Sequence, residues 1–222
     1  MKFVIKLGAA LILVPLISGF GEAFYRLTLK IVEKYDSYLF FLGGIGAGII
    51  SFPLLSRRKF IRTFEHEMTH LIFAKLFFGK VKKLNVTDEQ GGFVEYTSYP
   101  NPFISLSPYF FPLFSAIVAL LIPLLNTGIA KYASILIGFF LIQHLFYSIS
   151  EILASQPDIK EEGRLFSAIF ITFFTIFFYG TIISEQVSYN HILTFYRDGF
   201  SQSLENLNKF YHFILKSIAN LR

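Results

Sequence analysis

The chain has 222 residues, of which 54% are hydrophobic, only 16% are charged, and 29 are phenylalanine. Charged residues make up about a quarter of an ordinary soluble domain, so this composition excludes that class and predicts long apolar segments that span a membrane. The net charge is +5, but the basic residues gather beside apolar runs, where they anchor lipid headgroups or set topology, so we expect no nucleic-acid partner. No cysteine is present, which excludes disulfides and leaves histidine and carboxylate side chains as metal ligands.

Six apolar segments follow one another along the chain, and we expect them to form an all-α polytopic membrane protein. They cover residues 3–20, 38–55, 64–78, 103–125, 132–153 and 165–183. The first resembles a signal peptide, but its length and the lack of a clear cleavage site favour an uncleaved first helix. The glycines of the second, "GGIGAG", predict close packing against another helix. The third is too short to cross a bilayer by itself, so we expect it to enter the membrane only part of the way.

Three further features organise the chain. Residues 79–98 alternate polar and apolar side chains around a Gly-Gly pair, which predicts a β-hairpin or an extended loop, the only strand-like piece of the sequence. Prolines within 103–125 predict a kinked span. The tail at 189–222 is typical of an amphipathic helix that lies on the membrane or on the protein. With no internal repeat, we expect one membrane-embedded domain over 1–222.

The third segment contains His66-Glu67-Met68-Thr69-His70, an H-E-x-x-H pattern. Residues four apart lie on one face of a helix, so both imidazoles can reach the same metal ion, with Glu67 placed to accept a proton from its bound water. Zinc takes nitrogen and oxygen ligands in tetrahedral geometry and suits such a site. The alternative is a set of polar helix residues paired with one another or with Arg62. Ionisable groups within a membrane segment usually mark a functional site, so we favour the metal site.

A catalytic zinc site of this type needs a third protein ligand. Asp158 follows Pro157 in the loop between two spans, where a helix end can hold it near membrane depth, and it is our first choice. His144, within the fifth segment, is the rival. It could instead support a ligand, contact the substrate, or be hydrogen-bonded between helices. Glu151 and the Glu161–Glu162 pair are weaker candidates, and we expect the pair to be solvated.

The choice of Asp158 constrains the path of the chain. For Asp158 to meet the two histidines, the chain between them must cross the membrane an even number of times. The segments at 103–125 and 132–153 would supply two crossings. The short third segment must then turn back through the hairpin, as irregular backbone can do where it lines a cavity.

Four features together resemble the site-2 protease family of intramembrane zinc metallopeptidases. They are "HEMTH" in an apolar helix, a glycine-containing hairpin after it, "NPFISLSPYFFPL" opening the next segment, and a late aspartate. The resemblance covers residues 60–165, which would form the metalloprotease core. It implies that His66, His70 and Asp158 hold one Zn²⁺ per chain and that Glu67 is the general base. The aspartate lies in Gln-Pro-Asp-Ile, whereas better-known members read Asn-Pro-x-Asp-Gly or Leu-Asp-Gly, so the resemblance is to a divergent branch.

The activity that the resemblance implies is hydrolysis of a peptide bond within or near a transmembrane helix of a membrane-protein substrate. The hairpin edge at 84–96, which includes Val86, Phe93 and Val94, could pair with an unwound stretch of that substrate. We expect a multi-pass protein of the lipid bilayer, in a prokaryotic inner membrane.

A second interpretation is a membrane protein that binds zinc without proteolysis. It would be either an inactive relative or a metal-handling protein. A transporter distributes polar ligands along a path through its spans, and only Gln143, His144 and Glu151 hint at one.

Overall fold

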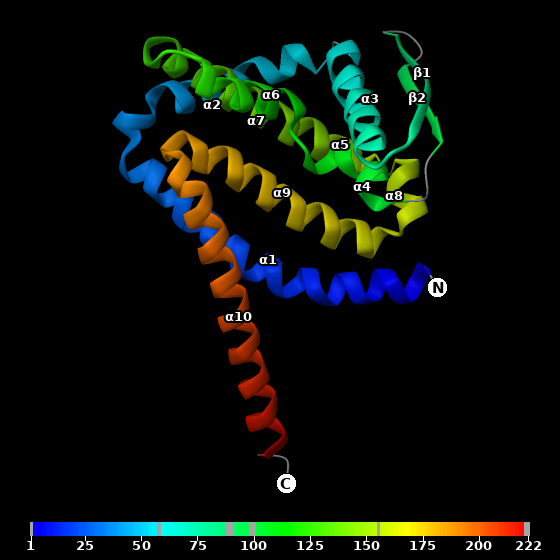
Figure 1. Ribbon diagram of the computed structural model, residues 1–222, viewed down its shortest axis with the longest axis vertical. Helices are drawn as coiled ribbons and strands as arrows, with labels where there is room; N and C mark the ends of the chain where they lie inside the picture. The colour runs from blue at the N-terminus through cyan, green and yellow to red at the C-terminus, as the bar shows by residue number, and fades with distance from the viewer. Residues whose placement is uncertain (1, 57–58, 88–90, 98–100, 155, 220–222) are drawn as a thin grey trace. The chain divides into compact units, whose positions relative to one another are not determined.

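The structure, a computed structural model, describes residues 2–56, 59–87, 91–97, 101–154 and 156–219 (Figure 1). The predicted all-α polytopic class is confirmed, because four helices among these residues are long and apolar enough to cross a membrane. They are Val4–Glu33, Tyr35–Leu55, Gly128–Leu153 and Arg164–Val187. The chain forms two compact units, Met1–Ser37 with Ala168–Arg222, and Tyr38–Ser167. The single membrane-embedded domain stays a prediction.

One unit joins the first and last helices of the chain. It contains α1 (Lys2–Glu33), most of α9 (Arg164–Val187) and α10 (Tyr189–Ala219). Its core is a cluster of aromatic rings around the fully buried Phe20, with centroids 5.0–5.7 Å away. These rings belong to Phe173, Phe177, Phe195 and Phe200. The predicted amphipathic tail is therefore a helix that packs part of its length on the protein, against α1.

In the other unit, α2 (Leu39–Leu55) packs along α7 (Thr127–Leu153), with η1 (Tyr35–Tyr38) leading into it. The glycines of α2 permit this contact, as the sequence predicts. A Cβ atom on Gly44 would lie 2.0 Å from the carbonyl oxygen of Ile135. The two backbones therefore approach more closely than any larger residue would allow.

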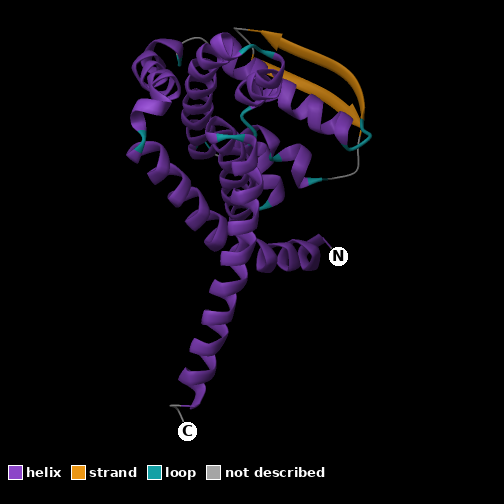
Figure 2. Cartoon of the chain, turned by 60° about the vertical axis from the view of Figure 1, so that its left-hand side comes forward, coloured by secondary structure: helices purple, strands orange, loops and turns teal. Residues whose placement is uncertain are grey.

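The H-E-x-x-H segment lies in α3 (Lys59–Leu76), and the predicted hairpin follows it as β1 (Lys80–Thr87) and β2 (Gly91–Thr97). The strands are antiparallel, with Val86 opposite Gly92 and Leu84 opposite Val94. Figure 2 shows the pair of strands running beside α3, which both strands contact.

The predicted single span over 103–125 is wrong. The chain instead forms four short helices, α4 (Pro102–Ser105), α5 (Ser107–Phe110), α6 (Leu113–Leu121) and the 3-10 helix η2 (Ile122–Leu124). Each begins at or next to a proline, which lacks a backbone N–H and clashes with the preceding turn. The apolar helix Leu113–Leu124 is shorter than the candidate spans. Of the two crossings expected before Asp158, only α7 is a full-length candidate.

Side chains of α7 bond the backbone that the broken segment leaves free. The imidazole Nε2–H of His144 donates to the Pro108 carbonyl at 3.0 Å. The Ser148 hydroxyl, one turn later, donates to the Tyr109 carbonyl at 2.6 Å. An unpaired buried carbonyl costs about 1–3 kcal/mol, so these bonds stabilise irregular backbone inside the unit. The last helix that lies entirely within this unit is the short α8 (Pro157–Glu162).

The close approach of α2 and α7 can be tested with a pair of alanine substitutions in α2. Gly44→Ala should destabilise the protein by about 1–3 kcal/mol, because its methyl group meets backbone of α7. Gly46→Ala is the matched control, since nothing lies within 4 Å of its added Cβ, and higher helix propensity should leave it neutral or slightly stabilised. Thermal unfolding in detergent measures both, and equal midpoints would contradict this packing.

Candidate metal centre

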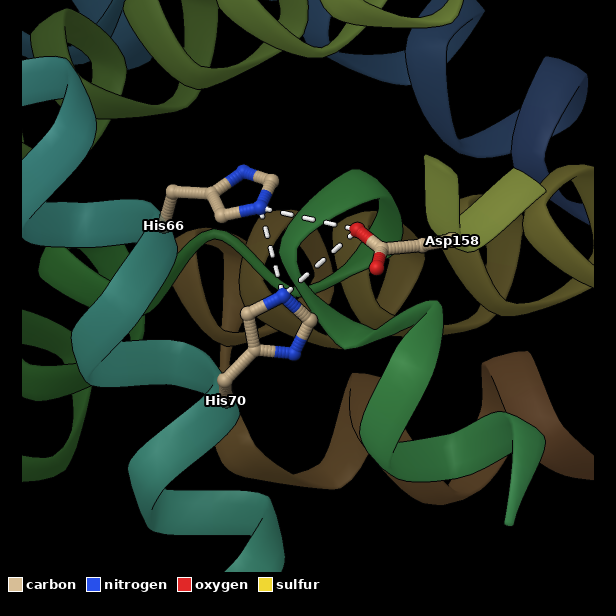
Figure 3. Close-up of side chains that lie close together, drawn as sticks. All are labelled: His66, His70 and Asp158. Atoms are coloured by element: carbon tan, nitrogen blue, oxygen red, sulfur yellow. Dashed lines mark hydrogen bonds and ion pairs between the residues drawn. The ribbon is translucent and has the colours of Figure 1, made fainter. Parts of the chain in front are cut away.

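Three ligand-type side chains meet at the side of α3. Figure 3 shows His66 and His70 projecting from α3 toward Asp158, which comes from α8. The two Nε2 atoms lie 3.2 Å apart. The nearer oxygen of Asp158, Oδ2, lies 3.9 Å from Nε2 of His66 and 3.7 Å from Nε2 of His70. Among the described residues, this is the group that could hold a metal ion.

Local structure places each of these side chains. His66 and His70 are four residues apart in a regular helix, so their imidazoles share one face. Asp158 lies in the first turn of α8, directly after Pro157 at the helix start. Proline suits the first position of a helix, and a carboxylate is favoured by the partial positive charge at that end.

Each histidine is oriented through its other ring nitrogen. Nδ1–H of His70 donates to the Ile104 carbonyl at 2.8 Å, and Nδ1–H of His66 donates to Oε2 of Glu151, also at 2.8 Å. A backbone carbonyl can only accept, so the proton of His70 lies on Nδ1 and its Nε2 carries a lone pair. The carboxylate of Glu151 has the same effect on His66. Two lone pairs and a carboxylate oxygen therefore face one another, an arrangement that a cation satisfies.

The separations of these atoms fit zinc. Ligands about 2.0–2.2 Å from a tetrahedral zinc ion lie roughly 3.3–3.6 Å from one another. The two Nε2 atoms, 3.2 Å apart, and the two separations from Asp158 Oδ2, 3.9 and 3.7 Å, lie within a few tenths of an ångström of that range. The three residues can therefore hold zinc in a nitrogen–nitrogen–oxygen site.

Two residues weighed as ligands bind elsewhere. Glu151 is the partner of His66, and its second oxygen lies 3.6 Å from Nε of Arg62. His144 is buried and bonds the Pro108 carbonyl through Nε2. The structure thus brings Asp158, and not His144, to the two histidines.

The two residues of the Glu161–Glu162 pair differ in exposure. Glu161 is exposed, as expected, but the expectation that Glu162 is solvated is wrong. Glu162 is buried and accepts a hydrogen bond from the Ser105 hydroxyl at 2.8 Å. Burial of this carboxylate follows from the packing of α8 on α4.

Glu67 lies between the histidines in the sequence and beside the hairpin in space. Its carboxylate accepts a hydrogen bond from the backbone N–H of Val94, and burial raises its pKa above the usual value. Burial acts on Asp158 in the same direction, but the Tyr109 hydroxyl donates to this carboxylate and stabilises its anionic form. Asp158 is thus an anionic group at neutral pH.

The structure also places the hairpin residues. Phe93 is partly exposed, and Val94 is the residue whose backbone reaches Glu67. Val86 is in β1 and pairs with Gly92; its side chain lies outside the described side chains.

Sequence reasoning missed two buried residues beside the site. The Tyr109 hydroxyl donates to Oδ2 of Asp158 at 2.9 Å, and its ring packs edge-on against His66 at 5.5 Å. Glu65 is buried and accepts hydrogen bonds from backbone N–H groups at the start of α6. Burial outweighs the lowering effect of these bonds and raises the pKa of Glu65 to about 8. In the sequence, the only feature that could have pointed to Glu65 is its position beside the H-E-x-x-H motif. No sequence feature points to Tyr109.

The fold and this site define a metalloprotease-like membrane protein. Residues 45–154 match the model of the family described as Peptidase M50B-like. The chain belongs to this family, which confirms the resemblance to site-2 proteases, and the family is zinc-dependent in general. The matched region contains His66, Glu67 and His70 and ends before Asp158. No curated protein and no solved structure gives a significant match to the chain.

Metal analysis of the detergent-purified protein tests the ligand set. We expect about one zinc per chain in the wild type and its loss in His70→Ala and Asp158→Ala, because each removes one of three ligands. His144→Gln is the control, since glutamine can still donate to the Pro108 carbonyl, and it should retain zinc. Zinc that survives Asp158→Ala but is lost in His144→Gln would move the third ligand into α7.

Proposed function

We propose that the protein is an intramembrane zinc metalloprotease that hydrolyses a peptide bond within or near a substrate transmembrane helix. One observation carries this proposal. His66, His70 and Asp158 converge at zinc-like separations, with the carboxylate of Glu67 on the same turn of α3. Membership in the Peptidase M50B-like family supports the same conclusion.

Each residue has a definite role in this proposal. His66, His70 and Asp158 hold one Zn²⁺ per chain, and Glu151 and the Ile104 carbonyl fix the orientation of the two imidazoles. When bound, zinc would act as a Lewis acid toward the scissile carbonyl and the attacking water. Glu67 accepts the proton of that water and passes it to the leaving amine.

The substrate must reach this site as an extended strand, because helical amides are hydrogen-bonded and covered by side chains. Backbone groups alternate in direction along a strand. The N–H of Val94 bonds Glu67, so this edge of β2 faces α3 and not β1. An extended substrate that pairs along this edge would lie beside the general base. In this proposal the partners of the protein are a membrane-protein substrate and the lipid bilayer, with no nucleic acid. The protein would act in a prokaryotic inner membrane.

Replacement of the general base should separate binding from catalysis. Glu67→Gln keeps the side-chain shape and removes no metal ligand, so zinc content should be unchanged while cleavage falls by about 10²–10⁴-fold. The measurement compares new N-termini of membrane proteins in cells that produce wild type, Glu67→Gln or His70→Ala. Termini should appear with the wild type alone.

A different outcome would favour the second interpretation. If the wild type binds zinc yet produces no more new termini than Glu67→Gln, the protein binds metal without proteolysis. Each of the three polar side chains of α7 that hinted at a transport path makes a hydrogen bond within the protein, which argues against such a path. Gln143 bonds the Gly48 carbonyl, His144 the Pro108 carbonyl and Glu151 the His66 imidazole.

Pairing of the substrate with β2 can be tested by crosslinking. A photoreactive residue at Phe93, in a Glu67→Gln background, should capture uncleaved substrate, and in the active protein it should capture shorter products. The same residue at Glu205, exposed on α10, is the control and should capture neither. If substrates identified from their new termini never crosslink at Phe93, pairing with the hairpin is wrong.

A further inference from the structure

We propose that Tyr109 and Ser105 are positioning residues that hold α8 and so set the third metal ligand, Asp158. This inference rests on the proposed function, because it concerns the ligand geometry of the same site. Neither hydroxyl touches the ligand histidines through a hydrogen bond, and neither belongs to the H-E-x-x-H motif. Both act through the helix that carries Asp158.

Two hydrogen bonds join the broken segment to α8. The Tyr109 hydroxyl donates to Oδ2 of Asp158 at 2.9 Å. The Ser105 hydroxyl donates to Oε1 of Glu162 at 2.8 Å. The two acceptors, Asp158 and Glu162, are four residues apart, so their carboxylates share one face of α8. The two donors are also four residues apart in the chain. The two bonds thus hold α8 at both of its ends.

The acceptor of the Tyr109 bond is the oxygen that matters for metal binding. Oδ2 is the Asp158 atom that lies 3.9 Å from Nε2 of His66 and 3.7 Å from Nε2 of His70. A carboxylate can rotate and exchange its two oxygens. A donor held against Oδ2 selects one orientation of the carboxylate. In that orientation the remaining lone pair of Oδ2 points toward the imidazoles.

Tyr109 is itself held rigidly. It is only 1% exposed, and its carbonyl accepts from the Ser148 hydroxyl at 2.6 Å. Its ring stands edge-on to the His66 imidazole, with centroids 5.5 Å apart. The phenol therefore has little freedom to follow Asp158, and Asp158 is instead placed by the phenol.

By contrast, α8 has little stability of its own. It has six residues, and Gly163 ends it with a φ of 93°. Isolated helices of this length do not persist in water, and the Asp158 side chain is still 31% exposed. Side-chain bonds to a rigid neighbour are therefore needed to keep the carboxylate beside the histidines.

The same segment orients a second ligand, since the Ile104 carbonyl accepts from Nδ1–H of His70. Residues 104–109 thus direct two of the three ligands toward one point. A hydroxyl that was only a packing element would contribute to folding and leave ligand geometry unaltered. This difference is what the experiment measures.

The test compares Tyr109→Phe with Tyr196→Phe in the full-length, detergent-purified protein. Tyr196 also loses a side-chain hydroxyl bond, to Thr181 at 2.9 Å, but it lies in α10, in the unit without the metal centre. Zinc affinity is measured by competition with a chelator, and Co²⁺ absorption reports ligand geometry. Tyr109→Phe should bind zinc about 10–100-fold more weakly and shift the Co²⁺ spectrum, whereas Tyr196→Phe should match the wild type in both.

Ser105→Ala is the second variant, and it keeps the inference testable if Tyr109→Phe does not fold. It touches no ligand directly and should weaken zinc binding several-fold through α8. Wild-type affinity and an unchanged Co²⁺ spectrum in the folded variants would overturn the positioning role and leave the proposed function intact. A wild type that binds neither ion after reconstitution would overturn both.

Discussion

Two nitrogen-bound protons set the geometry on which the rest of the site depends. Nδ1–H of His66 and Nδ1–H of His70 are each committed to an acceptor, Glu151 in one case and the Ile104 carbonyl in the other. Buried donors must be paired because an unpaired one costs about 1–3 kcal/mol. Once both protons are placed, both Nε2 lone pairs are available on the same side of α3. The carboxylate of Asp158 then completes a group of three acceptor atoms, two Nε2 atoms and one carboxylate oxygen, that face one another.

The acceptor for the His70 proton exists because the chain between α3 and α7 is broken, whereas the acceptor for the His66 proton is a side chain of α7. A continuous helix would use its carbonyls internally, whereas the prolines of residues 102–123 leave several of them free. His144 and Ser148 on α7 bond two of these carbonyls, and His70 bonds a third. Irregular backbone in an apolar protein is thus stable here because polar side chains bond it. The same break lets Tyr109 and Ser105 reach α8.

Much of the organisation could be predicted from residue patterns. The amphipathic tail, the hairpin after α3 and the close packing of the glycine-rich helix each follow from local periodicity or side-chain size. Apolar length alone predicts one kinked helix that crosses the membrane over 103–125. Whether several prolines kink a helix or divide it depends on partners for the freed carbonyls. Those partners are on α7, more than thirty residues further along the chain.

The sequence by itself determined the composition of a membrane protein and the relative placement of His66, Glu67 and His70. Helical spacing determines that placement, since neighbours four residues apart share a face whatever else surrounds them. Only the tertiary structure decided which of the distant polar groups meets the two imidazoles. It brings Asp158 to them, turns His144 to a backbone carbonyl and pairs Glu151 with His66. The physical reason is that such contacts join residues about forty to ninety positions apart. Their geometry depends on packing between helices, and no local pattern records it.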